Sequence, residues 1–107
     1  GKTKIVENSP VLIDIGGRVD DYCSDQTRTF WVGDSPSKEF LKTRELVQKA
    51  QEKAIKEINP GLPITEAYFI AKSYFQEYGV DKYFTHGLGH GIGLETHEPP
   101  AIGPLTK

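Results

Sequence analysis

Two runs of β-branched and aromatic residues near the start of the chain constrain the fold more than any other feature. The first run, VLIDI at residues 11–15, holds a single carboxylate, Asp14, among apolar neighbours, and the second is TRTFWV at residues 27–32. Both compositions are typical of β-strands, and glycine follows each run as a turn signal. We therefore predict a buried strand at residues 11–15, paired with its neighbour in a hairpin centred between Val19 and Asp20.

The predicted hairpin brings two carboxylates together. Asp14 and Asp25 are 11 positions apart, so they would lie directly opposite each other on neighbouring strands. Like charges repel in that position, and a buried carboxylate is costly unless something compensates it. A divalent cation is the simplest compensation, with carboxylates favouring Mn, Mg or Ca and added imidazole favouring Zn, Mn, Fe or Co. In the alternative, Asp14 bonds a backbone turn, Asp25 is exposed, and Arg28 pairs with one of them as an ordinary salt bridge.

Two stretches in the middle of the chain have helical periodicity. The first begins at Ser35, an expected N-cap, with Pro36 at the first helical position. Its apolar face is formed by Phe40, Val47, Ala50, Ala54 and Ile58. Thr65 is expected to cap the second helix, which ends at Gly79. The apolar face of the second helix is formed by Ala67, Ile70, Ala71, Tyr74 and Tyr78. Strands followed by helices predict the α+β class, and we interpret the aromatic residues of the second helix as core packing, not as a stacking surface for bases or sugars.

All three histidines of the chain fall within twelve residues. His86, His90 and His97 lie in the tract HGLGHGIGLETHEPP, where glycines let backbone and substrate approach closely. Imidazole suits both metal ligation and proton transfer near neutral pH, so the tract indicates the floor of a site. It is not a helical HExxH zinc motif. The alternatives are a glycine-rich surface loop without a specific role, and a nucleophilic Cys23 with a histidine partner.

Composition excludes several classes of protein. The net charge of -2 offers no basic surface for nucleic acid, and no apolar run approaches the roughly 18 residues of a membrane span. A single cysteine cannot form an internal disulfide, which fits a cytoplasmic protein. The chain has no methionine, which fits a fragment of a longer protein.

The motifs together resemble a known family. Asp14 in LIDIGG, Asp25 in SDQTRTF and the histidine tract are similar to methionine aminopeptidases, prolidases and Xaa-Pro aminopeptidases, which share the pita-bread fold. The SDQTRTF run and the His-x-x-Gly-His form of the tract resemble the Xaa-Pro branch, and methionine aminopeptidases are a weaker match. The resemblance implies that residues 1–107 are the N-terminal part of a single metallopeptidase catalytic domain, truncated before the last metal-ligand strands.

The resemblance also implies roles for individual residues. Asp14, Asp25 and His90 would be metal ligands, with Asp25 bridging two divalent ions of Mn, Co or Zn. His97 would be catalytic, contacting the scissile carbonyl or its tetrahedral intermediate. His86 would bind substrate, lining the pocket for the residue after the cleaved bond. The two ions would turn a bridging water into the nucleophile.

The implied function is a metal-dependent exopeptidase that hydrolyses short proline-containing peptides at Xaa-Pro bonds, as a homodimer in the full-length protein. Two further glutamate ligands of the family lie beyond the histidine tract, and Glu95 and Glu98 do not replace them. We therefore expect the isolated chain to be inactive. The alternatives are a non-catalytic peptide-binding module on the same fold and a metal-free hydrolase of the creatinase type.

Overall fold

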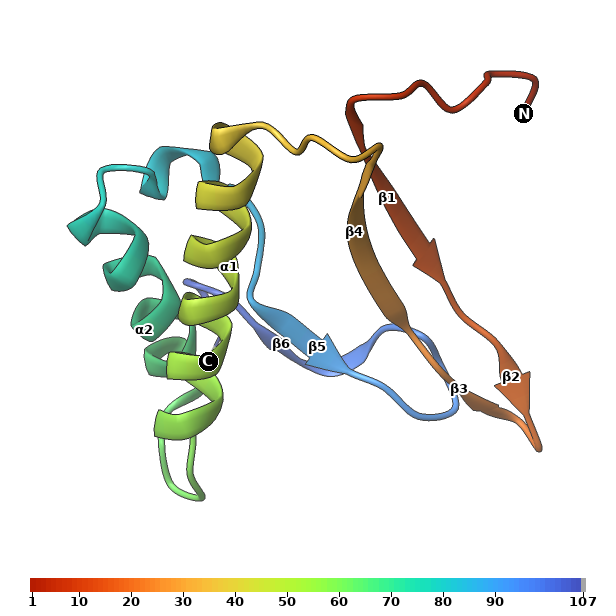
Figure 1. Ribbon diagram of the computed structural model, residues 1–107. Coiled ribbons are helices and arrows are strands. Elements are labelled where there is room, and N and C mark those ends of the chain that lie inside the picture. Colours follow the sequence, from red (N-terminus) through yellow and green to blue (C-terminus); the bar gives the residue numbers. More distant parts are fainter. Residues whose placement is uncertain (107) are drawn as a thin grey trace.

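The computed structural model describes residues 1–106, which form two helices and three small antiparallel sheets (Figure 1). The elements are β1 (Ser9–Ile15), β2 (Arg18–Val19), β3 (Tyr22–Cys23), β4 (Gln26–Val32), α1 (Lys38–Glu57), α2 (Ile64–Glu77), the 3-10 turn η1 (Asp81–Tyr83), β5 (Gly89–Gly91) and β6 (Glu98–Ile102). The predicted α+β class is confirmed.

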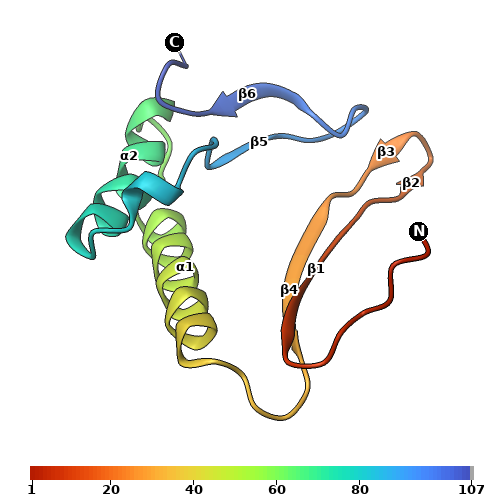
Figure 2. The same cartoon turned by 90° about the horizontal axis from the view of Figure 1, so that it is seen from above.

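The elements form an open frame instead of a close-packed body. The long hairpin of β1 to β4 stands on one side, α1 and α2 stand on the other, and β5 with β6 runs between them (Figures 1 and 2). The radius of gyration is 16.1 Å, whereas a compact chain of this length would have about 13 Å. The elements are therefore spread apart, and a cavity of about 1000 Å³ lies between the long hairpin and residues 86–97.

The hairpin turn is centred one residue later than predicted, which shifts the pairing register by two residues. Asp14 lies opposite Thr27, and the turn is formed by Asp20 and Asp21, both with positive φ, 48° and 68°. The predicted centre would have placed Val19 at a central turn position. A two-residue hairpin turn of this hand needs positive φ at both central residues, which aspartate tolerates and a β-branched residue does not. The prediction that Asp14 faces Asp25 directly is therefore wrong.

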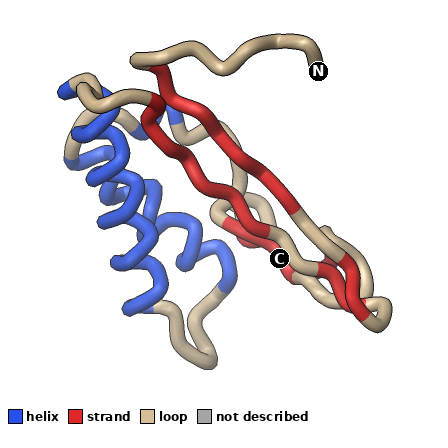
Figure 3. The backbone as a smooth tube through the Cα atoms, turned by 45° about the vertical axis from the view of Figure 1, so that its right-hand side comes forward, coloured by secondary structure: helices blue, strands red, loops and turns tan. Residues whose placement is uncertain are grey.

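The prediction that residues 11–15 form a buried strand is also wrong in this chain. Leu12 and Ile15 are each 63% exposed. Figure 3 shows why, because the helices pack on each other and not along the long hairpin, which α1 meets at its first turn, where the Phe40 and Trp31 rings have centroids 5.2 Å apart. Strand formation was predictable from β-branched composition, but burial needs a second layer, and no helix of residues 1–106 packs along the hairpin.

Both helices begin at other residues than predicted. Ser37, not Ser35, is the N-cap of α1, and its hydroxyl oxygen accepts a hydrogen bond of 3.1 Å from the Phe40 amide. Helix α2 begins at Ile64 with Pro63 in the cap position and no side-chain cap, so Thr65 lies inside the helix. Among residues 1–106, no helix combines the length and the apolarity that crossing a membrane requires.

The buried core lies between the two helices. It consists of Leu46, Ala50, Ala71 and Phe75, with Tyr74, Val80, Phe84 and Leu88 packed against it. The predicted faces are partly correct: the alanines are buried, but Val47 and Tyr78 are each 52% exposed. In α1 the core takes Leu46 in place of the adjacent Val47, while Ala50 and Ala54 stay on the buried face. Tyr68 and Phe75 are buried at 6% and 9% exposure, as the core-packing interpretation of the aromatic residues predicts, whereas Phe69 and Tyr78 are 48% and 52% exposed and do not fit it.

Candidate metal centre

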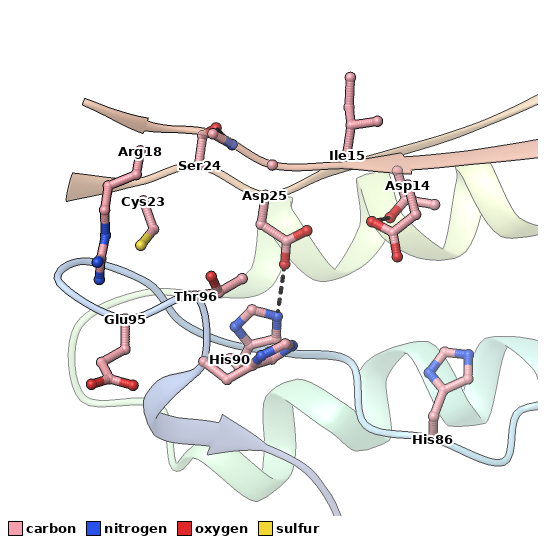
Figure 4. Close-up of a pocket in the computed structure, with 14 residues that line it drawn as sticks. Asp14, Ile15, Arg18, Cys23, Ser24, Asp25, His86, His90, Glu95 and Thr96 are labelled. Carbon is pink, nitrogen blue, oxygen red and sulfur yellow. Dashed lines mark hydrogen bonds and ion pairs between the residues drawn. The ribbon is translucent and has the colours of Figure 1, made fainter. Parts of the chain in front are cut away.

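Both predicted carboxylate ligands project from one face of the long hairpin. Side chains alternate between faces along a strand, so Asp14, its partner Thr27 and Asp25 share a face. Figure 4 shows Asp14 and Asp25 pointing to the same side of the hairpin, while Ile15 points away. The Thr27 hydroxyl donates a hydrogen bond of 3.0 Å to Asp14 Oδ1. The two carboxylates are thus diagonal neighbours on one surface.

The glycine-rich tract is not wholly irregular, because Gly89 to Gly91 form β5 and pair with β6. The pairing shifts register between His90 and Gly91, a bulge of the kind that redirects a side chain beside a site. A Cβ atom at Gly91 would collide with the carbonyl oxygens of Glu98 and Pro99. Glycine at this position therefore permits the close backbone approach that places His90.

The hairpin face and the histidine tract meet at Asp25. His90 Nε2 lies 3.1 Å from Asp25 Oδ2, as the dashed line in Figure 4 shows. The rings of His90 and His97 have centroids 4.3 Å apart. One potential ligand atom from each of Asp25, His90 and His97 lies within 4.8 Å of the others. Residues more than 60 positions apart thus converge on one small volume.

The donor atoms of this cluster fit a divalent metal ion. His90 Nδ1 lies 2.8 Å from the Gly91 carbonyl oxygen, and a carbonyl can only accept, so Nδ1 carries the proton. In the neutral ring, Nε2 then turns a lone pair toward the acceptor oxygen of Asp25. A cation shared by the two atoms removes that repulsion, and an outer hydrogen bond of this kind is typical of metal-binding histidines. Two imidazoles and a carboxylate suit Zn, Mn, Fe or Co.

The cluster lines a cavity of about 1000 Å³. Two other predicted site residues, Asp14 and His86, line the same cavity but lie outside the cluster. Asp14 is held by Thr27, as described above. His86 packs edge-on against the Phe84 ring at 5.1 Å between centroids, and its Nδ1 lies 2.7 Å from the Gly87 carbonyl oxygen. The roles predicted for these residues remain predictions.

Several residues of the cavity were not identified from the sequence. Arg18 and Thr27 line it, and Thr27 bonds directly to a predicted ligand. Thr27 could have been found, because it lies two positions after Asp25 and so shares its face. The sequence drew attention to Arg28 instead, as a possible partner of an aspartate. Arg28 in fact donates to the Thr27 carbonyl oxygen at 2.8 Å.

Cys23 also lines the cavity. Its thiol lies 3.5 Å from the Leu94 carbonyl oxygen, which fits a packing role beside the site. Glu95 and Thr96, in the loop before His97, complete the wall that faces the hairpin tip.

Comparison with known proteins assigns the family. The model of metallopeptidase family M24 matches residues 1–107. An uncharacterized peptidase of Staphylococcus epidermidis is 45% identical over 107 residues, which are 100% of this chain and 30% of that protein. The prolidase from Pyrococcus furiosus has a TM-score of 0.95 and 39% identity, covering 100% of this chain and 32% of that one. An Xaa-Pro dipeptidase from Bacillus anthracis has a TM-score of 0.93 and 37% identity, covering 99% of this chain and 30% of that one.

These matches confirm the resemblance to the prolidase branch and identify the architecture as part of the pita-bread fold. The chain spans 30% of the length of the Staphylococcus epidermidis relative. The family is one of metallopeptidases, which agrees with the donor set formed by Asp25, His90 and His97. The chain belongs to metallopeptidase family M24.

Proposed function

We propose that this chain forms part of the catalytic domain of a metal-dependent exopeptidase that hydrolyses short peptides at Xaa-Pro bonds. The observation that carries the proposal is the convergence of Asp25 and His90, with Nε2 and Oδ2 3.1 Å apart, in a chain whose fold matches a prolidase with a TM-score of 0.95. The full-length protein, meaning this sequence within a polypeptide of its relatives' length, would be the active form and a homodimer.

Asp14, Asp25 and His90 are the proposed metal ligands in this chain, for two ions of Mn, Co or Zn. When bound, such ions polarise a carbonyl group and lower the pKa of water enough for it to act as a nucleophile at neutral pH. The Thr27 hydroxyl, 3.0 Å from Asp14 Oδ1, restricts the carboxylate to one orientation. This outer hydrogen bond supports a ligand role for Asp14, although Asp14 lies outside the Asp25, His90 and His97 cluster.

His97 and His86 would act on the substrate. His97 lies beside His90, with ring centroids 4.3 Å apart, so a carbonyl group next to the metal site would be within its reach. A hydrogen bond from His97 to the developing oxyanion would stabilise the transition state more than the ground state. His86, braced by Phe84 at the cavity wall, would line the pocket for the residue after the cleaved bond.

The 107-residue chain alone is expected to bind metal weakly and not to catalyse, because only three of the proposed ligands lie in it. The Glu98 carboxylate is engaged within the loop, where it accepts a hydrogen bond of 3.2 Å from the Glu95 backbone amide, and neither glutamate belongs to the Asp25, His90 and His97 cluster. The remaining glutamate ligands would come from further strands of the full-length protein.

The test is calorimetric titration of Mn, Co and Zn into the chain and into the full-length protein, with cleavage assays on an Xaa-Pro dipeptide and a matched dipeptide without proline. We expect tight binding of two ions and proline-dependent cleavage only in the full-length protein. Failure of both forms to bind metal, with peptide still bound but not cleaved, would show a non-catalytic binding module instead.

A further inference from the structure

The two halves of the candidate site belong to separate sheets, and one backbone hydrogen bond joins them among residues 1–106. Asp25 lies on the long hairpin, whereas His90 and His97 lie in and after β5, which pairs only with β6 among residues 1–106. At the hairpin tip, the Cys23 amide donates to the Gly93 carbonyl oxygen at 2.7 Å. The alignment of carboxylate and imidazoles therefore depends on how the tip holds the loop of residues 92–97.

Arg18 makes the second contact at this point. Its Nη2 donates to the Leu94 carbonyl oxygen at 2.8 Å, and the Cys23 thiol approaches the same oxygen at 3.5 Å. Arg18 pairs with Cys23 in the hairpin register, and Figure 4 shows its side chain extending toward the loop from the side that carries Asp25. Successive carbonyl oxygens of the loop, at Gly93 and Leu94, are thus bound by opposite strands of the tip.

Two bonds to adjacent carbonyls restrain the loop more than one bond does. Without Arg18, the loop would be held by the Cys23 amide hydrogen bond and by the weak thiol contact of the same residue, so it could rotate about Cys23. A second, charge-assisted bond from Arg18 to the next carbonyl opposes that rotation. Cys23 lies two positions before Asp25, and the carbonyl groups that are bound, at Gly93 and Leu94, lie between His90 and His97. A rotation of the loop about this contact would therefore displace both imidazoles from the Asp25 carboxylate.

We propose that Arg18 is a positioning residue, whose bond to the Leu94 carbonyl holds the loop in the orientation that presents His90 and His97 to Asp25. The proposal concerns the arrangement of the site, and its effect on metal affinity rests on the proposed function. Outer contacts of metal sites typically change affinity by about 10–100-fold when removed, because the ligands are no longer preorganised.

The test compares three variants of the full-length protein. Arg18→Ala removes the bond, Arg18→Lys retains a cationic donor, and Arg28→Ala is the matched control. Arg28 lies on the same hairpin, but within the described part of the chain its side chain donates only to the carbonyl oxygen of its neighbour Thr27. Arg18→Lys also provides a variant with near-native charge if Arg18→Ala does not fold.

Cobalt titration followed by visible absorption is the first measurement, because the bands report the ligand geometry of the bound ion. We expect Arg18→Ala to weaken cobalt affinity about 10–100-fold and to alter the bands, Arg18→Lys to recover part of the affinity, and Arg28→Ala to match the wild type. Unchanged affinity and bands in Arg18→Ala would overturn the proposal. A raised KM with native cobalt bands would instead indicate direct contact with substrate, and would overturn it as well.

Hydrogen exchange of the metal-free protein separates this proposal from the proposed function. If Arg18 anchors the loop, Arg18→Ala accelerates exchange of the Cys23 amide and of residues 92–97, while Arg28→Ala does not. That result would support the anchor even if the wild-type protein bound no cobalt, an outcome that would defeat the proposed function alone. Native exchange in both segments of Arg18→Ala would contradict the anchor whatever the metal data show.

Discussion

The helical corner of this chain, where α1 packs against α2, and the long hairpin of β1 to β4 are held together by different forces. In the corner, Ala71 is fully buried and Phe75 is 9% exposed, so apolar contacts support the packing. In the hairpin, no residue of β1 to β4 is buried, and the backbone ladder with its side-chain hydrogen bonds supports the structure. The predicted metal ligands all lie outside the buried core. Stability is concentrated in one region and site chemistry in another, so substitutions in the two regions should separate stability from metal binding.

The largest loss of stability is expected in the helical corner. Phe75→Ala should lower the free energy of unfolding by about 3–5 kcal/mol, because it leaves a cavity beside Ala71 and Phe84. Phe69→Ala is the control, since Phe69 lies on the same helix but is 48% exposed. Urea unfolding followed by circular dichroism measures both. Equal losses in the two variants would show that the corner does not carry the stability.

The largest loss of metal binding is expected in the hairpin. Asp25→Ala should abolish metal-dependent cleavage by the full-length protein and weaken metal affinity more than about 100-fold, because a lost ligand exceeds the effect of a lost outer contact. Asp34→Ala, which removes an exposed carboxylate just after β4, should bind metal normally. Elemental analysis and calorimetry measure metal content and affinity, and unfolding midpoints are expected to change little. Normal activity of Asp25→Ala would exclude the proposed role.

A substitution in the tract between the two regions should affect both properties. Gly91→Ala would press a methyl group against the Glu98 and Pro99 carbonyls and separate β5 from β6. We expect a loss of about 1–3 kcal/mol in the free energy of unfolding, together with weaker metal binding as His90 moves. Gly89→Ala is the control in the same strand, because its Cβ would meet Ile102 Cδ1 at an ordinary 3.6 Å. Identical behaviour of the two variants would mean that the close approach at Gly91 is unimportant.

The smallest effect is expected on the face of the hairpin that points away from Asp14 and Asp25, where Ile15 lies. Ile15→Thr in the 107-residue chain should change the free energy of unfolding by no more than about 0.5 kcal/mol, because Ile15 is 63% exposed and threonine retains strand propensity. Thermal unfolding monitored by circular dichroism is sufficient. A loss comparable with that of Phe75→Ala would show that the hairpin is packed in solution and would remove the contrast between the two regions.

The positions of β1, β4 and both helices could be predicted from the sequence to within a few residues, because propensity and periodicity act locally, whereas the short strands β5 and β6 were not predicted. The hairpin centre was misplaced by one residue, since the choice between Val19 and Asp21 as a turn residue depends on φ and not on spacing. The helix faces were partly misassigned for a related reason. Leu46 and Val47 are both apolar neighbours, and only the partner helix decides which of them is buried.

The sequence by itself identified the candidate donor atoms of the site, because carboxylates on a strand and histidines in a glycine-rich tract are local features. It also determined the family, which the comparison over residues 1–107 confirms. Only the tertiary structure decided that Arg18, and not Arg28, contacts the loop, and that Asp25 rather than Asp14 meets His90. The physical reason is that these contacts join groups about 65 to 76 positions apart, a side chain and a backbone carbonyl in one case and two side chains in the other, and no local residue pattern specifies which groups will meet.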